Sequence, residues 1–86
     1  MRNKRIHETF LKLVANMSLQ PGCYNVGIVN ILTGEFVTET QGEIPDENYR
    51  WEDFYQWLIE DMSEVGNIEE LTIAYMEYDG KPGEVI

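Results

Sequence analysis

The chain of 86 residues contains a single cysteine, Cys23, and a single histidine, His7. One cysteine excludes an internal disulfide and agrees with a reducing compartment, so we expect a cytoplasmic protein, in a bacterial host cell if a phage encodes it. One histidine and one cysteine are too few for a structural zinc site. Any Cys/His or Ser/His/Asp catalytic centre would depend on His7, close to the start of the chain. We predict no enzyme activity, no metal site and no cofactor.

Lysine and arginine are scarce after residue 20. Residues 1–20 hold four of the six basic residues against one acid, Glu8, whereas the rest of the chain holds Arg50 and Lys81 against fifteen acids. The negative charge that gives the net charge of −10 therefore lies in the chain after residue 20. Such a field repels phosphate backbones and anionic membrane surfaces and attracts cationic partners. We expect no direct binding to nucleic acid or to a membrane.

The sequence also has no apolar segment long enough to cross a bilayer, and "HETFLKLVANMSLQ" is too often interrupted by polar residues for a signal peptide. With 43% hydrophobic and 12% aromatic residues, the chain has enough apolar surface for a core. Its length suits one small domain and is too short for two. We predict a single acidic domain over residues 1–86.

Apolar periodicity predicts a small α+β domain in the order α-β-β-α-β, with two helices packed on a three-stranded, curled, antiparallel or mixed sheet. The first helix is expected over residues 4–19, and "QPG" ends it. The next segment, "CYNVGIVN", is expected to form a central strand covered on both faces. Asn30 and Gly34 predict a bulged hairpin that leads to a half-solvated strand over residues 35–41.

The second helix is expected over residues 51–65, "WEDFYQWLIEDMSEV". Trp57 and Ile59 lie beside its buried stripe, so the helix has more apolar surface than a core needs. Asp46 or Asn48 is expected to cap its start. The predicted buried stripe consists of Trp51, Phe54, Tyr55, Leu58, Met62 and Val65.

A third strand is expected over residues 71–78, because "LTIAYMEY" alternates in the manner of a strand. The alternation places Leu71, Ile73 and Tyr75 on one face. The remaining segment, "DGKPGEVI", is expected to form a turn and a short tail that adds pairing at the edge of the sheet.

No motif for catalysis stands out among these elements. Sixteen acids in 86 residues bring carboxylates together by chance, so a carboxylate pair says little about acid–base chemistry. The segment "PDENYRWED" lacks the order of a calcium-binding loop, and "DGKPG" lacks the spacing of a phosphate-binding loop. The acidic surface is the feature that remains.

Acidic side chains on the second predicted helix form the centre of the candidate site. Asp53, Glu60 and Glu64 project away from the buried stripe, and carboxylates one turn apart are about 5.4 to 6 Å apart along the axis. This is close to the spacing of phosphates along one DNA strand, on the order of 6 Å. The second strand and the link after it extend the negative field, and Trp57 is a predicted apolar anchor. The predicted partner-binding residues are Glu39, Glu43, Asp46, Glu47, Glu52, Asp53, Trp57, Glu60, Asp61 and Glu64.

These residues predict a non-enzymatic inhibitor that occupies a basic, nucleic-acid-binding surface of a partner protein, as a DNA mimic. Solubility alone explains the near absence of basic residues less well, because repulsion among unpaired carboxylates costs stability. Aromatic residues such as Trp57, Tyr49 and Tyr78 near these acids are typical of an interface centre with a charged rim. In size and charge the chain is similar to phage and plasmid anti-defence inhibitors such as anti-CRISPR proteins.

Two other interpretations stay open at this point. An immunity or antitoxin-like protein, or a regulatory subunit, would bind a dedicated basic partner without competition from DNA. A structural homodimer would form through Trp57, Ile59 and an open strand edge. The sequence leaves open whether the protein is a monomer or a homodimer, and in which order the strands lie.

Overall fold

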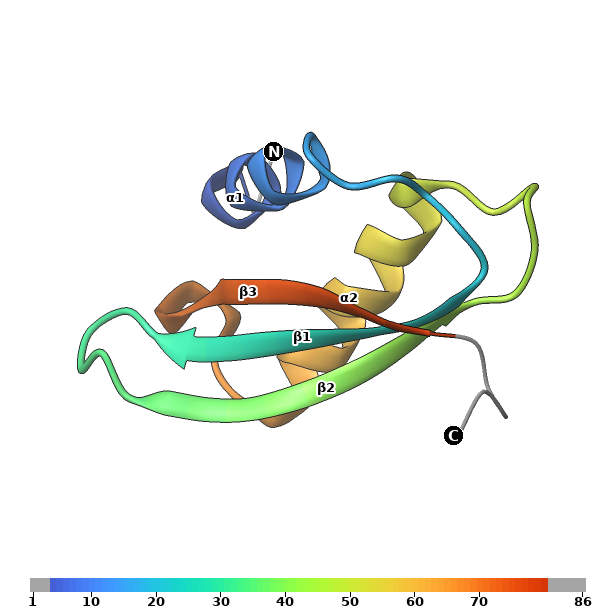
Figure 1. Cartoon of the computed structure of the whole chain (residues 1–86). Coiled ribbons are helices and arrows are strands. Elements are labelled where there is room, and N and C mark those ends of the chain that lie inside the picture. Colours follow the sequence, from blue (N-terminus) through green and yellow to red (C-terminus); the bar gives the residue numbers. More distant parts are fainter. Residues whose placement is uncertain (1–3, 81–86) are drawn as a thin grey trace.

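The structure is a computed structural model, and it describes residues 4–80. Its elements follow in the order α1 (Lys4–Val14), β1 (Gly22–Asn30), β2 (Phe36–Ile44), α2 (Trp51–Val65), the short 3-10 helix η1 (Ile68–Glu70) and β3 (Leu71–Gly80). The predicted α-β-β-α-β order is therefore confirmed (Figure 1). The predicted tail pairing of residues 81–86 lies outside the described residues.

The sheet has the strand order β2-β1-β3, and both outer strands run antiparallel to β1. The central place predicted for β1 is confirmed. Both helices contribute to one core with Tyr24, Val26 and Ile28 of β1, so they cover the same face of the sheet. Asn25 and Val29 point to the opposite face and lie outside this core. The prediction that β1 is covered on both faces is wrong.

The core is apolar throughout, and the described residues contain no buried polar or charged residue. Full burial of one large apolar side chain contributes about 1.5 to 3 kcal/mol, so this cluster supplies the main stabilisation. Among the described residues no helix is long and apolar enough to cross a membrane. The buried residues are Ile6, Phe10, Val14, Tyr24, Val26, Ile28, Ile44, Phe54, Leu58, Met62, Leu71, Ile73 and Met76.

Helix α1 is shorter than predicted, because it ends at Val14 instead of residue 19. The chain after it is held by the buried Tyr24 hydroxyl, which donates to the carbonyl oxygens of Ser18 and Gln20 and accepts from the Gln20 N–H at 3.2 Å. These backbone groups bond to a side chain of β1 instead of to a further helical turn. The helix itself ends in a turn, in which the Met17 N–H donates to the Val14 carbonyl oxygen at 3.0 Å, and the Tyr24 contact holds the segment that follows.

The hairpin between β1 and β2 forms as predicted. The N–H groups of Leu32 and Thr33 donate to the Asn30 side-chain oxygen at 2.8 and 3.1 Å, and Gly34 has a positive φ of 77°. A separate register shift between Ile28 and Val29 leaves Val37 of β2 without a partner on β1, and this bulge was not predicted. Strand β2 runs on to Ile44, three residues beyond the predicted end.

A second register shift changes β3. Ile28 pairs with Ile73 and Gly27 pairs with Tyr75, so Ala74 is an extra residue with no partner on β1. A bulge of this kind reverses the faces of the residues that follow it. Tyr75 therefore points away from the core and Met76 points into it. The predicted grouping of Tyr75 with Ile73 on one face is wrong.

Helix α2 has the predicted bounds, but its N-cap residue differs from the prediction. Its N-cap is Arg50, whose N–H donates to the Asp53 carboxylate at 3.2 Å. Asp46 accepts from the Asn48 N–H at 2.8 Å in the preceding turn, too far along the chain to cap the helix. The predicted cap at Asp46 or Asn48 is wrong, and Val65, predicted to be buried, is exposed.

Candidate protein-binding surface

The solvent side of α2 carries the acids that the sequence spacing predicts. Successive residues in an α-helix are about 100° apart, so Asp53, Glu60 and Glu64 lie within about 40° of one another around the axis. Their carboxylates therefore follow one line along the exposed side of the helix. The exposed acids of α2 are Glu52, Asp53, Glu60 and Glu64, and Asp61 is half-buried.

Acids at the two ends of α2 interact with the helix dipole in opposite ways. Glu52 and Asp53 lie in the first turn, where the unpaired N–H groups favour negative charge. Glu64 lies in the last turn, which contains no basic residue and where the unpaired carbonyl groups favour positive charge. Helix formation therefore explains the acids at the start of α2 and does not explain Glu64.

Trp57 is half-buried and packs against the sheet. Its ring lies 5.3 Å from that of Phe54, and a Cβ atom added to Gly42 of β2 would come within 2.5 Å of it. Gly42 thus leaves the space that the indole occupies. On α2, Trp57 is one turn from both Asp53 and Asp61. The structure places Trp57 beside the acids of α2. Because the indole is half-buried against the sheet, only part of it is accessible to a partner, which is less than the predicted role as an apolar anchor requires.

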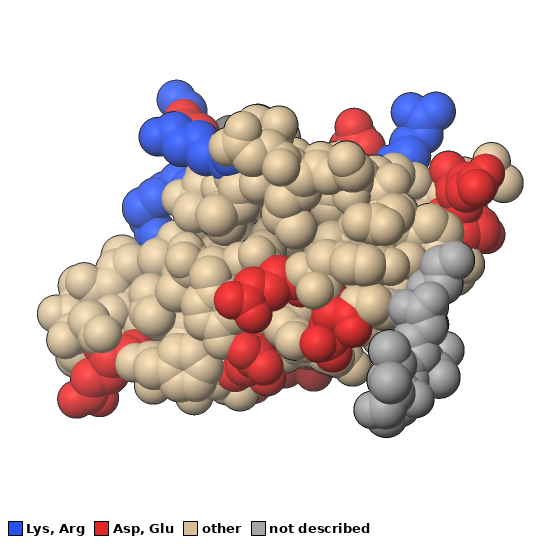
Figure 2. Space-filling model, in the orientation of Figure 1, with Lys and Arg blue, Asp and Glu red and all other residues tan. Residues whose placement is uncertain are grey.

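The outer face of the sheet, opposite the helices, holds a further set of acids. Figure 2 shows acidic side chains grouped over the strands, whereas basic side chains lie at the margins of the same view. Gln41 links all three strands here, since its amide donates to Asn25 on β1 at 2.9 Å and to Asp79 on β3 at 3.3 Å. The exposed acids of this face are Glu39, Glu43, Glu77 and Asp79.

The Tyr75 ring crosses this outer face. It covers Gly27 of β1, and its hydroxyl donates a hydrogen bond to the Glu39 carboxylate on β2. This hydrogen bond, together with partial desolvation and the negative charges of Glu39 and Glu77, raises the pKa of Tyr75 to about 12. Tyr75 is therefore a neutral donor at physiological pH, and Glu39 is fixed in place as an acceptor.

Residues Glu77 and Asp79 were not predicted as site residues, because the regular alternation of "LTIAYMEY" gives no sign of the bulge at Ala74. Gly27 was the one available signal. A glycine inside a central strand often marks a place where another group approaches closely, and here that group is Tyr75.

The link between β2 and α2 carries the last two predicted site residues, Asp46 and Glu47. Both are exposed. The Asp46 carboxylate accepts the Asn48 N–H and so stabilises the turn, whereas Glu47 has no hydrogen bond of this kind. The predicted site is thus spread over α2, the link and the outer sheet face.

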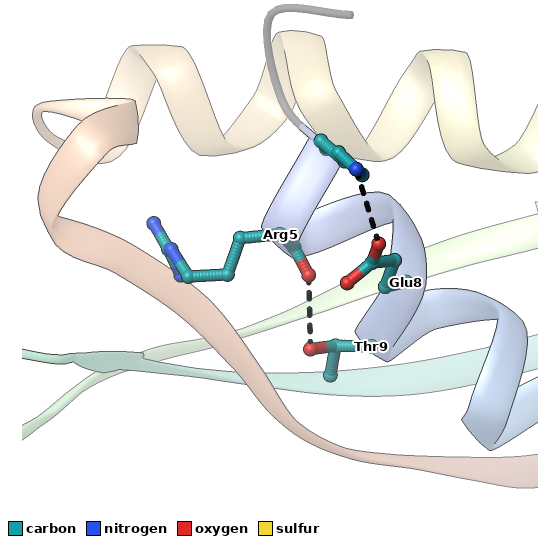
Figure 3. A network of polar contacts seen from close by, with 4 residues as sticks. Arg5, Glu8 and Thr9 are labelled. Carbon is teal, nitrogen blue, oxygen red and sulfur yellow. Dashed lines mark hydrogen bonds and ion pairs between the residues drawn. The ribbon is translucent and has the colours of Figure 1, made fainter.

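Basic residues do not neutralise these acids. Within residues 4–80 the one ion pair joins Lys4 and Glu8 on α1, at 4.0 Å (Figure 3). Arg5 instead donates to the backbone carbonyl oxygens of Leu71 and Glu69, at 3.0 and 3.3 Å. The carboxylates of α2 and β2 have no ionic partner in the described part of the chain.

His7 and Cys23 lie on different elements. The His7 ring packs against Tyr55 of α2, with ring centroids 4.8 Å apart. Cys23 is half-buried at the start of β1, opposite Glu43 of β2. Residues 4–80 contain no group of three or more His, Cys, Asp or Glu side chains arranged to hold a metal ion.

Comparison of the chain with protein-family models, with curated proteins and with solved structures finds no match. The surface itself is therefore the basis of the functional argument.

Proposed function

We propose that this protein is a non-enzymatic inhibitor that binds a basic, nucleic-acid-binding surface of a partner protein through the acidic side of α2. The observation that carries the proposal is the line of exposed carboxylates at Asp53, Glu60 and Glu64, which have no ionic partner within residues 4–80. A basic groove on a partner would supply the missing counter-charges.

The spacing along α2 supports a phosphate-like arrangement. With a rise of about 1.5 Å per residue, Glu60 and Glu64 are about 6 Å apart along the axis and Asp53 lies about 10 Å before Glu60. Successive phosphates of one DNA strand are separated by a distance on the order of 6 Å. A phosphate-binding groove can therefore accept Glu60 and Glu64 at the positions of neighbouring phosphates, with Asp53 about two phosphate spacings away.

The cost of this charge to the fold also supports a binding role. Glu64 opposes the helix dipole, and the acids of α2 and β2 repel one another without compensation. Exposed acids that serve solubility alone can be placed at helix starts or beside lysines, where they stabilise the fold. At least Glu64 is not placed in this way.

Affinity capture with the tagged protein tests the proposal. The bait is incubated with bacterial lysate at low salt, and bound proteins are eluted with a DNA duplex or with high salt. We expect a basic, nucleic-acid-binding protein that both eluents release. A partner that DNA cannot displace would contradict the mimic and would support the immunity-like or regulatory interpretation. Capture of a host nuclease would support an anti-defence role of the anti-CRISPR type.

A charge-reversal pair then locates the binding surface. Glu60→Lys is expected to slow association with the captured partner and to reduce its dependence on salt, because the electrostatic attraction is weakened. The matched control is Glu8→Lys, which changes the net charge equally but lies on α1. Equal effects of the two variants would mean that net charge, and not the α2 surface, governs binding.

A further inference from the structure

The tip of the β1–β2 hairpin, residues 31–37, exposes four large apolar side chains. Leu32 is 73% exposed, Phe36 57%, Ile31 42% and Val37 39%. They make up most of the exposed large hydrophobic residues in the described part of the chain. Exposed apolar residues that are scattered singly need no explanation, but a cluster at one projecting tip indicates an interaction site.

The hairpin tip is held in one conformation by its own hydrogen bonds. The Asn30 side chain accepts from Leu32 and Thr33, and the Gly34 N–H donates to the Asn30 carbonyl oxygen at 2.8 Å. The Ile31 N–H donates to the Glu70 carbonyl oxygen at 2.8 Å, which ties the tip to η1. A turn ordered before binding loses little conformational entropy on association.

Three acidic residues lie in or beside the apolar tip. Glu35 lies within it, and Glu69 and Glu70 lie in η1, to which the tip is hydrogen-bonded. The neighbouring cation is Arg5, whose guanidinium is directed at backbone carbonyl oxygens of Glu69 and Leu71. An apolar centre with acidic neighbours is complementary to an apolar pocket with a basic rim.

We propose that the hairpin tip inserts into an apolar pocket, bordered by Lys or Arg, on the same basic partner that the acidic side of α2 binds. The inference rests on the proposed function, since it takes a basic protein as the occupant. Leu32 and Phe36 are the anchors that enter the pocket. Charge argues against the other occupants: a second copy would bring two chains of net charge −10 together, and an anionic membrane would repel both Glu35 and η1.

Site-specific photo-crosslinking in bacterial lysate tests the docking of the tip. The photoreactive residue p-benzoylphenylalanine replaces Leu32 in one variant and Leu11 in the control. Leu11 is a suitable control because it is 49% exposed on α1, away from the hairpin. We expect Leu32→p-benzoylphenylalanine to crosslink to a basic protein, at a peptide that contains apolar residues next to Lys or Arg, and the control to give no such product.

Four results would overturn the proposal: crosslinking to a second copy of this chain, to lipid, or to a protein that is not basic, or equal crosslinking from both positions. Crosslinking by itself is not sufficient support. The crosslinked partner is therefore purified and its affinity measured for Leu32→Ser, Phe36→Thr and the control Leu11→Ser.

Leu32→Ser and Phe36→Thr are each expected to weaken binding at least tenfold, whereas Leu11→Ser leaves it unchanged. Circular dichroism should show that all three variants keep the wild-type fold. Unchanged affinity for both tip variants would overturn the anchor role. If the tip variants lose affinity but DNA does not compete with the partner, the docking of the tip stands and the nucleic-acid mimicry fails.

Discussion

The Tyr75 hydroxyl on β3 donates a hydrogen bond to the Glu39 carboxylate on β2, so these two residues bridge the full width of the three-stranded sheet. The bridge crosses β1 at Gly27, where the aromatic ring lies directly over the backbone. A sheet face without a covering helix is thus stabilised by one side chain that spans all its strands.

The first prediction concerns Gly27. A methyl group at this position would overlap the Tyr75 ring, so Gly27→Ala should lower the free energy of unfolding by about 1 to 3 kcal/mol in urea denaturation. The matched control is Gly66→Ala, where the backbone is extended and the added methyl meets Leu71 at 3.3 Å. In a Tyr75→Ser background the cost of Gly27→Ala should largely disappear. An unchanged cost there would show that the ring is not the cause.

The second prediction concerns the titration of Tyr75. Its pKa of about 12 in the folded protein lies above the ordinary value of 10.0, so Tyr75 stabilises the fold below pH 10 and this contribution is lost as the pH rises from 10 towards 12. Glu39→Gln should lower the pKa of Tyr75 in an NMR titration of the tyrosine ring carbons, because the charged acceptor is removed. The control Glu43→Gln lies on the same face. A Tyr75 pKa that is the same in wild type and Glu39→Gln would disprove the hydrogen bond.

The third prediction uses the two ends of α2. Glu64→Lys should raise the free energy of unfolding by about 0.3 to 1 kcal/mol, because a cation replaces an anion in the last turn. Glu52→Lys makes the same change of charge in the first turn and should lower stability by a similar amount. If Glu64 serves binding, Glu64→Lys should also weaken the captured partner's affinity. Stabilisation without loss of affinity would remove Glu64 from the binding surface.

The fourth prediction concerns the contact between α1 and β3. Arg5→Gln should lower the free energy of unfolding by about 1 kcal/mol, since the guanidinium bonds to the carbonyl oxygens of Leu71 and Glu69 are lost. Lys12→Gln removes the same charge from an exposed position in the last turn of α1 and should cost less, about 0.3 kcal/mol, through the lost interaction with the helix dipole. If both variants lowered the thermal unfolding temperature equally, the loss of charge, and not the loss of the Arg5 hydrogen bonds, would explain the effect of Arg5→Gln.

Several features of the fold could be predicted because they depend on residues close together in the chain. The hairpin follows from Asn30 and Gly34, whose side chain and backbone form the turn locally. The acidic line on α2 follows from helical spacing, since Asp53, Glu60 and Glu64 share a side in any regular helix. The element order was correct for the same reason.

Other features depended on contacts between distant segments. The conformation of the segment after α1 depends on the Tyr24 hydroxyl, the position of the Trp57 ring against the sheet depends on Gly42, and the direction of Tyr75 depends on how β3 pairs with β1. One extra residue at Ala74 moves Tyr75 and Glu77 relative to the core, and a further register shift leaves Asp79 without a partner on β1. The sequence of β3 alone does not indicate either shift.

The sequence alone thus specified an acidic α+β domain, its hairpin and the charged side of α2, because composition and short-range periodicity are properties of the chain. Only the tertiary structure decided the register of β3 against β1 and, with it, the acids of the outer face. The physical reason is that strand register is set by pairing between residues far apart in sequence, and a shift of one residue exchanges the faces of a strand.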